Sequence, residues 1–197
     1  MRLANDANCF ALSEASDGAG AGAHVVFGVI LGTGTGGGVV VGGEVLGGVN
    51  AIAGEWGHNG LPWPTADEWP GPPCYCGKRG CIETFLSGEG LRAAYGAADA
   101  PTAHAIASAA DAGEARSAAA VELYAHRLAK ALASVVNILD PDVVVLGGGL
   151  SNIESLYTRV PALWTAWVFS DRVDTRLARA RHGDSSGVRG AAWLWPL

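Results

Sequence analysis

The stretch that decides how this sequence folds runs from Gly54 to Glu83 and reads GEWGHNGLPWPTADEWPGPPCYCGKRGCIE. Three of the four cysteines of the chain, Cys74, Cys76 and Cys81, fall within eight residues, and His58 precedes them. One imidazole and three thiolates make a complete ligand set for a closed tetrahedral zinc site. These ligands favour zinc over magnesium or calcium, which prefer oxygen. We therefore expect a structural zinc ion held by these four residues.

The spacing of the cysteines leaves two alternatives open. The pattern is Cys-x-Cys-x4-Cys rather than the familiar Cys-x2-Cys, so a disulfide or buried free thiols would also fit. Gly77 and Gly80 favour the metal, because glycine permits the tight turns that bring three sulfurs round one ion.

The same stretch carries two carboxylates that a zinc ion does not need, Glu55 and Glu83. Ionised carboxylates accept hydrogen bonds from several hydroxyl groups at once, which is how a protein can grip a sugar. Asn50, just upstream, can both donate and accept. The alternative is that both glutamates are solvated surface charges, the usual state of this residue.

Composition excludes several classes of partner. The chain has 197 residues, 49% of them apolar, and a net charge of −6 with no run of lysine or arginine. Nucleic acid and an anionic membrane surface are therefore not expected as partners. No stretch is long and apolar enough to predict a membrane span. Few cysteines, three of them in a metal-like cluster, indicate a reducing, cytoplasmic setting.

Upstream of this stretch, residues 5–15 are expected to form a helix with Asn5 or Asp6 as its N-cap. A carboxylate at such a position could accept a proton from a hydroxyl, although an ordinary cap explains it equally well. A buried strand is expected at 24–31. The glycine-rich run Gly32–Gly38 follows it, and further strands make this a hairpin rather than the strand-to-helix turn of a P-loop. Backbone N–H groups in such a turn can still cradle an anion.

Downstream, the pattern predicts alternating helices and strands, which is an α/β architecture with ligands beyond the carboxyl ends of the strands. Helices are expected at 84–95, 101–112, 115–139 and 152–168, and a buried strand at 142–149. Ser151 and Glu154 have the spacing of a capping box for the last of these helices. The three glycines 147–149 would let a nucleotide approach the backbone.

Taken together, these motifs resemble those of the ROK family (repressor, open reading frame, kinase). The resemblance rests on Asn5-Asp6 before a helix, the run Leu31–Gly38, Ala53-Gly-Glu-Trp-Gly-His58, the cysteine motif that ends at Glu83, and Val145-Leu-Gly-Gly-Gly149, and it covers nearly the whole chain. Within the family, His58-Asn-x-Leu-Pro-Trp and Pro73-Cys-Tyr-Cys-Gly-Lys are most similar to bacterial fructokinase of the manno-fructokinase type. N-acetylglucosamine kinase and glucokinase are the nearest relatives by motif.

The resemblance implies a fold, a reaction and roles for particular residues. The fold would be the actin/hexokinase-like (ribonuclease H-like) ATPase fold with a small zinc-binding insertion, and the reaction ATP-dependent phosphorylation of a hexose, with fructose expected first. Asp6 would be the general base. The sugar-binding residues would be Asn5, Asn50, Glu55, His58 and Glu83. The ATP-binding residues would be Gly32, Thr33, Gly34, Gly36, Gly148 and Gly149. Magnesium would enter with ATP, zinc would be structural, and a homodimer is expected.

The sequence departs from the family pattern at its start. Family kinases open with a strand and an Asp-x-Gly-Gly-Thr phosphate loop, which these residues lack. We therefore expect residues 1–197 to be the C-terminal portion of a ROK kinase, with residues 54–83 as its zinc- and sugar-binding segment. Because the first phosphate loop is missing from these residues, we expect impaired turnover of ATP by this portion alone.

Three hypotheses follow. The first is a hexose kinase or the large fragment of one. The second is a non-catalytic sugar- and zinc-binding module, as the repressor branch of the family suggests, although no basic helix-turn-helix precedes residue 5. The third is a vestigial site with purely structural cysteines and glycines. ATP turnover separates the first from the others.

Overall fold

A five-stranded mixed sheet forms the centre of the structure, a computed structural model that describes residues 5–183 and 186–193. The strands are β1 (Val25–Leu31), β2 (Thr35–Val41), β3 (Glu44–Val45), β4 (Val143–Gly147) and β5 (Arg176–Arg179). Their order is β3-β2-β1-β4-β5. The pairs β1–β2 and β2–β3 are antiparallel, whereas β1–β4 and β4–β5 are parallel. The strands β1 and β4 therefore end at the same edge of the sheet.

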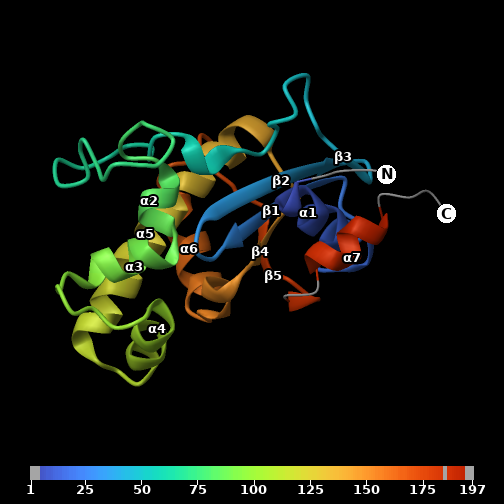
Figure 1. Cartoon of the computed structure of the whole chain (residues 1–197). Coiled ribbons are helices and arrows are strands. Elements are labelled where there is room, and N and C mark those ends of the chain that lie inside the picture. Colours follow the sequence, from blue (N-terminus) through green and yellow to red (C-terminus); the bar gives the residue numbers. More distant parts are fainter. Residues whose placement is uncertain (1–4, 184–185, 194–197) are drawn as a thin grey trace.

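Helices cover both faces of this sheet, with α1 and α7 on one side and α5 and α6 on the other (Figure 1). The helices are α1 (Asp6–Asp17), α2 (Ile82–Leu86), α3 (Gly88–Tyr95), α4 (Ala103–Asp111), α5 (Ala115–Leu139), α6 (Leu156–Trp164) and α7 (Ser186–Trp193), with 3-10 turns η1 (Trp56–His58) and η2 (Gly149–Asn152). In the described residues, no helix has the length and apolar character needed to cross a bilayer. Residues 54–83 carry the four candidate metal ligands, and we call them the metal-bearing segment; they lie after β3 and run into the first turn of α2.

The alternation of side chains along β1 divides the core in two. Val26 faces α1 and packs with Phe10, whereas Phe27 and Val29 belong to the larger cluster under α5. Side chains on both faces of a strand are buried only when both faces are covered, which explains the uninterrupted apolar run in the sequence. Gly28 lets α1 approach closely, because a Cβ there would lie 2.8 Å from the Cβ of Ala11.

Helix α7 is tied to α1 by polar contacts. Glu14 is fully buried and accepts hydrogen bonds from the backbone N–H groups of Arg181 (3.0 Å) and His182 (3.2 Å). His182 Nε2 lies 2.9 Å from Asp17 Oδ1, and Arg189 donates to the other oxygen. Arg189 lies on α7, and Arg181 and His182 lie on the segment before it, so these contacts hold both parts against α1.

The helix predicted at 84–95 is two helices. The chain breaks at Ser87, which is buried and extended, and whose Oγ accepts the N–H of Gly90 as the N-cap of α3. Glycines at 88 and 90 weaken a continuous helix. The other predicted helices upstream of residue 140 and the strands around Gly32 are confirmed within a few residues.

The helix predicted at 152–168 starts later, at Leu156, and the capping box is wrong. Ser151 Oγ donates to the carbonyl of Gly148 instead of capping, and Glu154 forms an ion pair with Arg179 (2.6 Å). The strand β5 that carries Arg179 was not predicted, because its four residues have no alternating apolar pattern.

Candidate functional site

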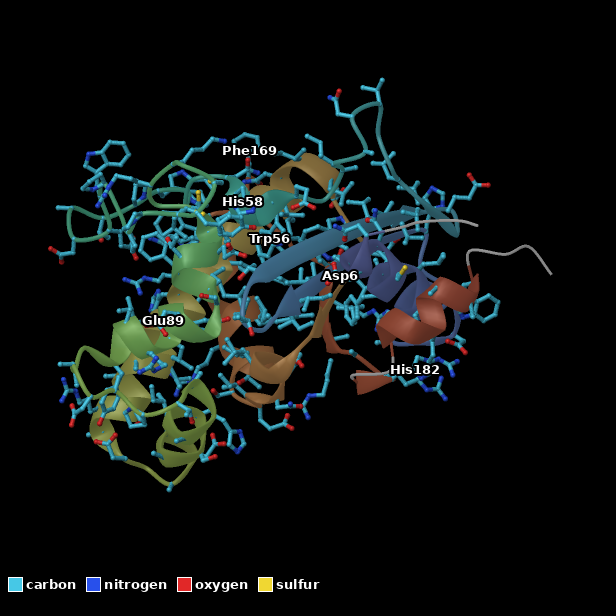
Figure 2. The ribbon with its side chains drawn as sticks, in the orientation of Figure 1. Asp6, Trp56, His58, Glu89, Phe169 and His182 are labelled. Carbon is cyan, nitrogen blue, oxygen red and sulfur yellow. The ribbon has the colours of Figure 1, made fainter. Side chains whose placement is uncertain are left out.

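A cavity of about 440 Å³ gathers most of the polar residues that the sequence pointed to. We call it the carboxylate cavity. Its chemical groups come from the start of α1, the turn between β1 and β2, and the metal-bearing segment; among its lining residues are Asn5, Asp6, Gly32, Thr33, Gly34, Thr35, Gly36, Glu55, His58, Tyr75 and Glu83. Asp6 lies at the N-terminal end of α1, and His58 lies on the segment after β3 (Figure 2). Three carboxylates thus converge from segments far apart in the chain.

The N-terminus of α1 presents Asp6 to this cavity. Asn5 caps the helix, since its side-chain oxygen accepts the N–H of Ala7 (2.8 Å), and its amide donates to Glu55 Oε1 (3.2 Å). Asp6, in the first turn, is exposed and also accepts the N–H of Ala7 (2.8 Å). Asn5 therefore acts as a structural cap and also links α1 to the metal-bearing segment.

Glu83 holds the glycine-rich turn in place. It lies in the first turn of α2, and its Oε2 accepts the backbone N–H of Thr35 (3.0 Å). Gly34 leaves room for this contact, because a Cβ there would lie 2.6 Å from the same oxygen and would push the glutamate aside. One Glu83 oxygen is therefore committed to the turn, which leaves its second oxygen for a ligand.

His58, Cys74, Cys76 and Cys81 come together as predicted, with one ligand atom from each lying within 4.8 Å of all the others. The sulfurs of Cys76 and Cys81 are 3.6 Å apart, and Cys74 Sγ is 3.6 Å from His58 Nδ1. Zinc–sulfur bonds of about 2.3 Å at tetrahedral angles place two sulfurs about 3.7 Å apart, so the four atoms fit one ion. All four cysteines of the chain are free thiols, which does not support the disulfide alternative.

The thiols of this cluster differ in acidity. Burial raises the pKa of Cys81 to about 12, and hydrogen bonds to neighbouring thiols act in the same direction. The backbone N–H of Lys78 is the main cause of a lowered pKa at Cys76. A metal ion that binds such thiols displaces their protons, so its binding is coupled to pH.

Tyr75, which the sequence did not single out, also lines the carboxylate cavity. Its hydroxyl lies 2.8 Å from His58 Nε2, and the two rings meet edge to face with centroids 5.0 Å apart. The negative charge of Glu83 is the largest cause of a raised pKa at Tyr75, so the phenol keeps its proton at neutral pH. Its position in the sequence, between two predicted metal ligands, could have indicated that it lies near the site.

A second cavity, of about 690 Å³, adjoins the first. We call it the helix cavity, because α3 and α4 supply much of its wall. Of the residues predicted to bind ATP, Gly32 and Thr33 line both cavities, Gly149 lines the helix cavity, and Gly34 and Gly36 line the carboxylate cavity instead. Gly148 does not line the helix cavity; its φ is +80°, and a Cβ there would lie 2.5 Å from the carbonyl oxygen of Leu31.

The helix walls of this cavity were missed by the sequence analysis. They include Glu89 and Arg92 of α3, together with Ala103, Ala107 and Asp111 of α4. The residues of α4 recur every four positions and so share one side of the helix. Alanines at that spacing in the sequence could have indicated a helix face made of small side chains.

A buried ion cluster fastens the metal-bearing segment to α5. Glu68 is 5% exposed, and its oxygens accept from Lys130 Nζ (2.6 Å) and Arg127 Nε (2.9 Å). Lys130 also donates to the carbonyl of Trp63 (3.1 Å). Burial would raise the pKa of Glu68, but Lys130, the N–H of Thr65 and Arg127 together lower it to about 2. The sequence analysis did not predict this contact, since no local pattern marks Glu68 as a buried residue.

Asn50 is the one predicted sugar-binding residue that does not line the carboxylate cavity. It is exposed in the loop between β3 and η1, which projects from the sheet (Figure 1). Neighbouring apolar side chains of the same loop, such as Val49, are exposed as well.

The sequence is similar to known proteins along almost its whole length. The model of the ROK family matches residues 1–197. An N-acetyl-D-glucosamine kinase of Yersinia pseudotuberculosis is 45% identical over 98% of this chain and 66% of its own length. The chain thus spans slightly less than two thirds of the curated relatives that it matches.

Solved structures give the same picture. A ROK hexokinase from Thermus thermophilus superposes with a TM-score of 0.84 at 36% identity, covering 96% of this chain and 63% of that one. A ROK family glucokinase from Streptomyces griseus, in complex with glucose and AMPPNP, superposes with a TM-score of 0.86 at 28% identity. The match covers 98% of this chain and 67% of the glucokinase chain. The predicted actin/hexokinase-like ATPase fold is confirmed.

Proposed function

The chain belongs to the ROK family, and from this premise we propose that it binds a hexose in the carboxylate cavity and ATP in the helix cavity, and takes part in transferring the γ-phosphate to the sugar. The observation that carries the proposal is that Gly32 and Thr33 line both cavities. A phosphate held at this shared wall would lie between the two substrates.

The residues supply what phosphoryl transfer needs, which is positioning and charge neutralisation. As a sugar hydroxyl oxygen forms its bond to the γ-phosphorus and the bond to the β-phosphate oxygen breaks, Asp6 would accept the hydroxyl proton. Asn5 and Glu55 would hold other hydroxyls, as would the second oxygen of Glu83. Backbone N–H groups of the turn from Gly32 to Gly36 would meet phosphate oxygens.

The metal-bearing segment would serve the sugar side. Zinc held by His58, Cys74, Cys76 and Cys81 would be structural, because four protein ligands close its coordination shell. Magnesium would arrive with ATP, bound to its phosphates. Neither ion needs to touch the reacting hydroxyl for Asp6 to act.

N-acetyl-D-glucosamine is the first substrate to test. The 45% identity to an N-acetyl-D-glucosamine kinase supports this sugar better than fructose, the sugar expected from the sequence. The likeness to a glucokinase structure keeps glucose as a comparison.

The test is ADP release by the metal-loaded chain with ATP, magnesium and each of the three sugars. We expect turnover with N-acetyl-D-glucosamine, reduced at least about 100-fold in Asp6→Asn. Asp171→Asn, an exposed aspartate outside both cavities, is the matched control and should be unchanged. A folded, metal-loaded chain that binds sugar and ATP without turnover would contradict the catalytic proposal and favour a binding module.

A further inference from the structure

Tyr75 occupies an unusual place, between two cysteines of the metal cluster and at the wall of the carboxylate cavity. Its side chain is not packed into the core; the residue is 84% exposed. What places its ring is the contact with His58: the hydroxyl lies 2.8 Å from Nε2, and the two rings meet edge to face. Held in this way, the ring forms part of the cavity wall.

The two nitrogens of His58 face different partners. Nδ1 faces Cys74 Sγ at 3.6 Å, and Nε2 faces the hydroxyl of Tyr75 at 2.8 Å. A metal on Nδ1 leaves the ring proton on Nε2, so the imidazole donates to the phenolic oxygen. The phenolic O–H is then free to donate to another acceptor, such as a sugar oxygen in the same cavity.

The ring of Tyr75 also borders a neighbouring cavity of about 660 Å³, which we call the proline cavity. Pro72, Pro73 and Ala93 contribute apolar surface to it. Tyr75 and Glu83 line both this cavity and the carboxylate cavity. A substituent on a sugar held by Glu83 could therefore extend past the tyrosine ring onto an apolar wall.

We propose that Tyr75 is a specificity-determining residue of the sugar site. Its hydroxyl donates to a sugar oxygen, and its ring, with the proline cavity, receives an N-acyl substituent of the sugar. The assignment rests on the proposed function and names the chemical class, an N-acylated hexosamine. A preference for this class over the unsubstituted hexose is the property that Tyr75 confers.

Two variants separate the hydroxyl from the ring. Tyr75→Phe keeps the ring, so we expect N-acetyl-D-glucosamine and glucose both to bind about 5-fold more weakly with their ratio unchanged. Tyr75→Ala removes the apolar contact as well, and the preference for N-acetyl-D-glucosamine should fall at least about 10-fold. Trp69→Ala, an exposed aromatic on the same segment that lines neither cavity, should leave both affinities unchanged.

Calorimetric titration of each sugar into each protein, with metal content measured in parallel, makes the test. Bound metal equal to that of the wild type shows that the cluster is intact. If Tyr75→Ala loses metal, Tyr75→Phe still tests the role of the hydroxyl. If the wild type prefers N-acetyl-D-glucosamine and both variants keep its affinities, the assignment of Tyr75 is overturned while the proposed function stands. If the wild type binds no sugar, both are overturned.

Discussion

The carboxylate cavity and the helix cavity share Gly32 and Thr33 but are built from different materials. The first takes its character from ionisable side chains, with Asp6, Glu55 and Glu83 brought together by a metal cluster and a helix cap. The second is shaped by the backbone at Gly149 and by α3 and α4, where Ala103 and Ala107 leave space beside charged residues such as Arg92. The first cavity therefore depends on three carboxylates held at fixed positions, whereas the second depends more on the space that its helices leave open.

The largest expected effect comes from the candidate metal ligands, because His58 and the adjoining Tyr75 line the carboxylate cavity and do not line the helix cavity. Cys81→Ser should lose the metal and weaken sugar binding at least about 100-fold, because His58, Tyr75 and Glu83 lose their common support. Binding of a non-hydrolysable ATP analogue should change much less. Metal analysis and titration with both ligands check this, with Cys9→Ser, a buried thiol outside the cluster, as the control.

This contrast also decides what the sequence could predict. The sequence could predict His58, the three clustered cysteines and Glu83. Few other residue types can bind a metal ion or accept hydrogen bonds from several hydroxyl groups, so their pattern is informative. The walls from α3 and α4 were not predictable, since alanines and surface charges such as Glu89 and Arg92 are common on helices for many reasons. Glu68 was missed because nothing local marks a loop carboxylate that will meet Lys130, sixty-two residues away, inside the core.

The buried ion cluster offers the next largest effect, on stability. Glu68→Gln leaves Lys130 buried without its charge partner, and removing one member of such a pair costs about 3 kcal/mol or more. Urea unfolding measures this, with the exposed neighbour Asp67→Asn as the control. A loss under about 1 kcal/mol would mean that the segment is not fastened to α5 by this contact.

The pH dependence of stability gives a further test of the same contact. The pKa of Glu68 is lowered from an ordinary 4.5 to about 2 in the folded chain. Its contribution is therefore fully present above about pH 4.5 and is lost as the pH falls from there toward 2. Unfolding free energies between pH 6 and 3 should fall less steeply in Glu68→Gln than in the wild type. Parallel profiles for the two proteins would contradict this.

The smallest expected effect comes from a substitution in the wall of the helix cavity. Ala107→Leu adds bulk to the wall of the helix cavity and should weaken binding of the ATP analogue about 10-fold while sugar affinity stays constant. Ala105→Leu, on the exposed side of the same helix, is the matched control. Equal loss of both ligands in Ala107→Leu would show that the two cavities do not act as separate sites.

The most direct test of the central claim is transfer of the labelled γ-phosphate of ATP to N-acetyl-D-glucosamine by the metal-loaded chain. The label should appear in a sugar phosphate with the wild type and at least about 100-fold more slowly with Asp6→Asn, since both cavities meet at Gly32 and Thr33 and Asp6 takes the proton. Label found only in inorganic phosphate, or equal transfer by the two proteins, would contradict the account.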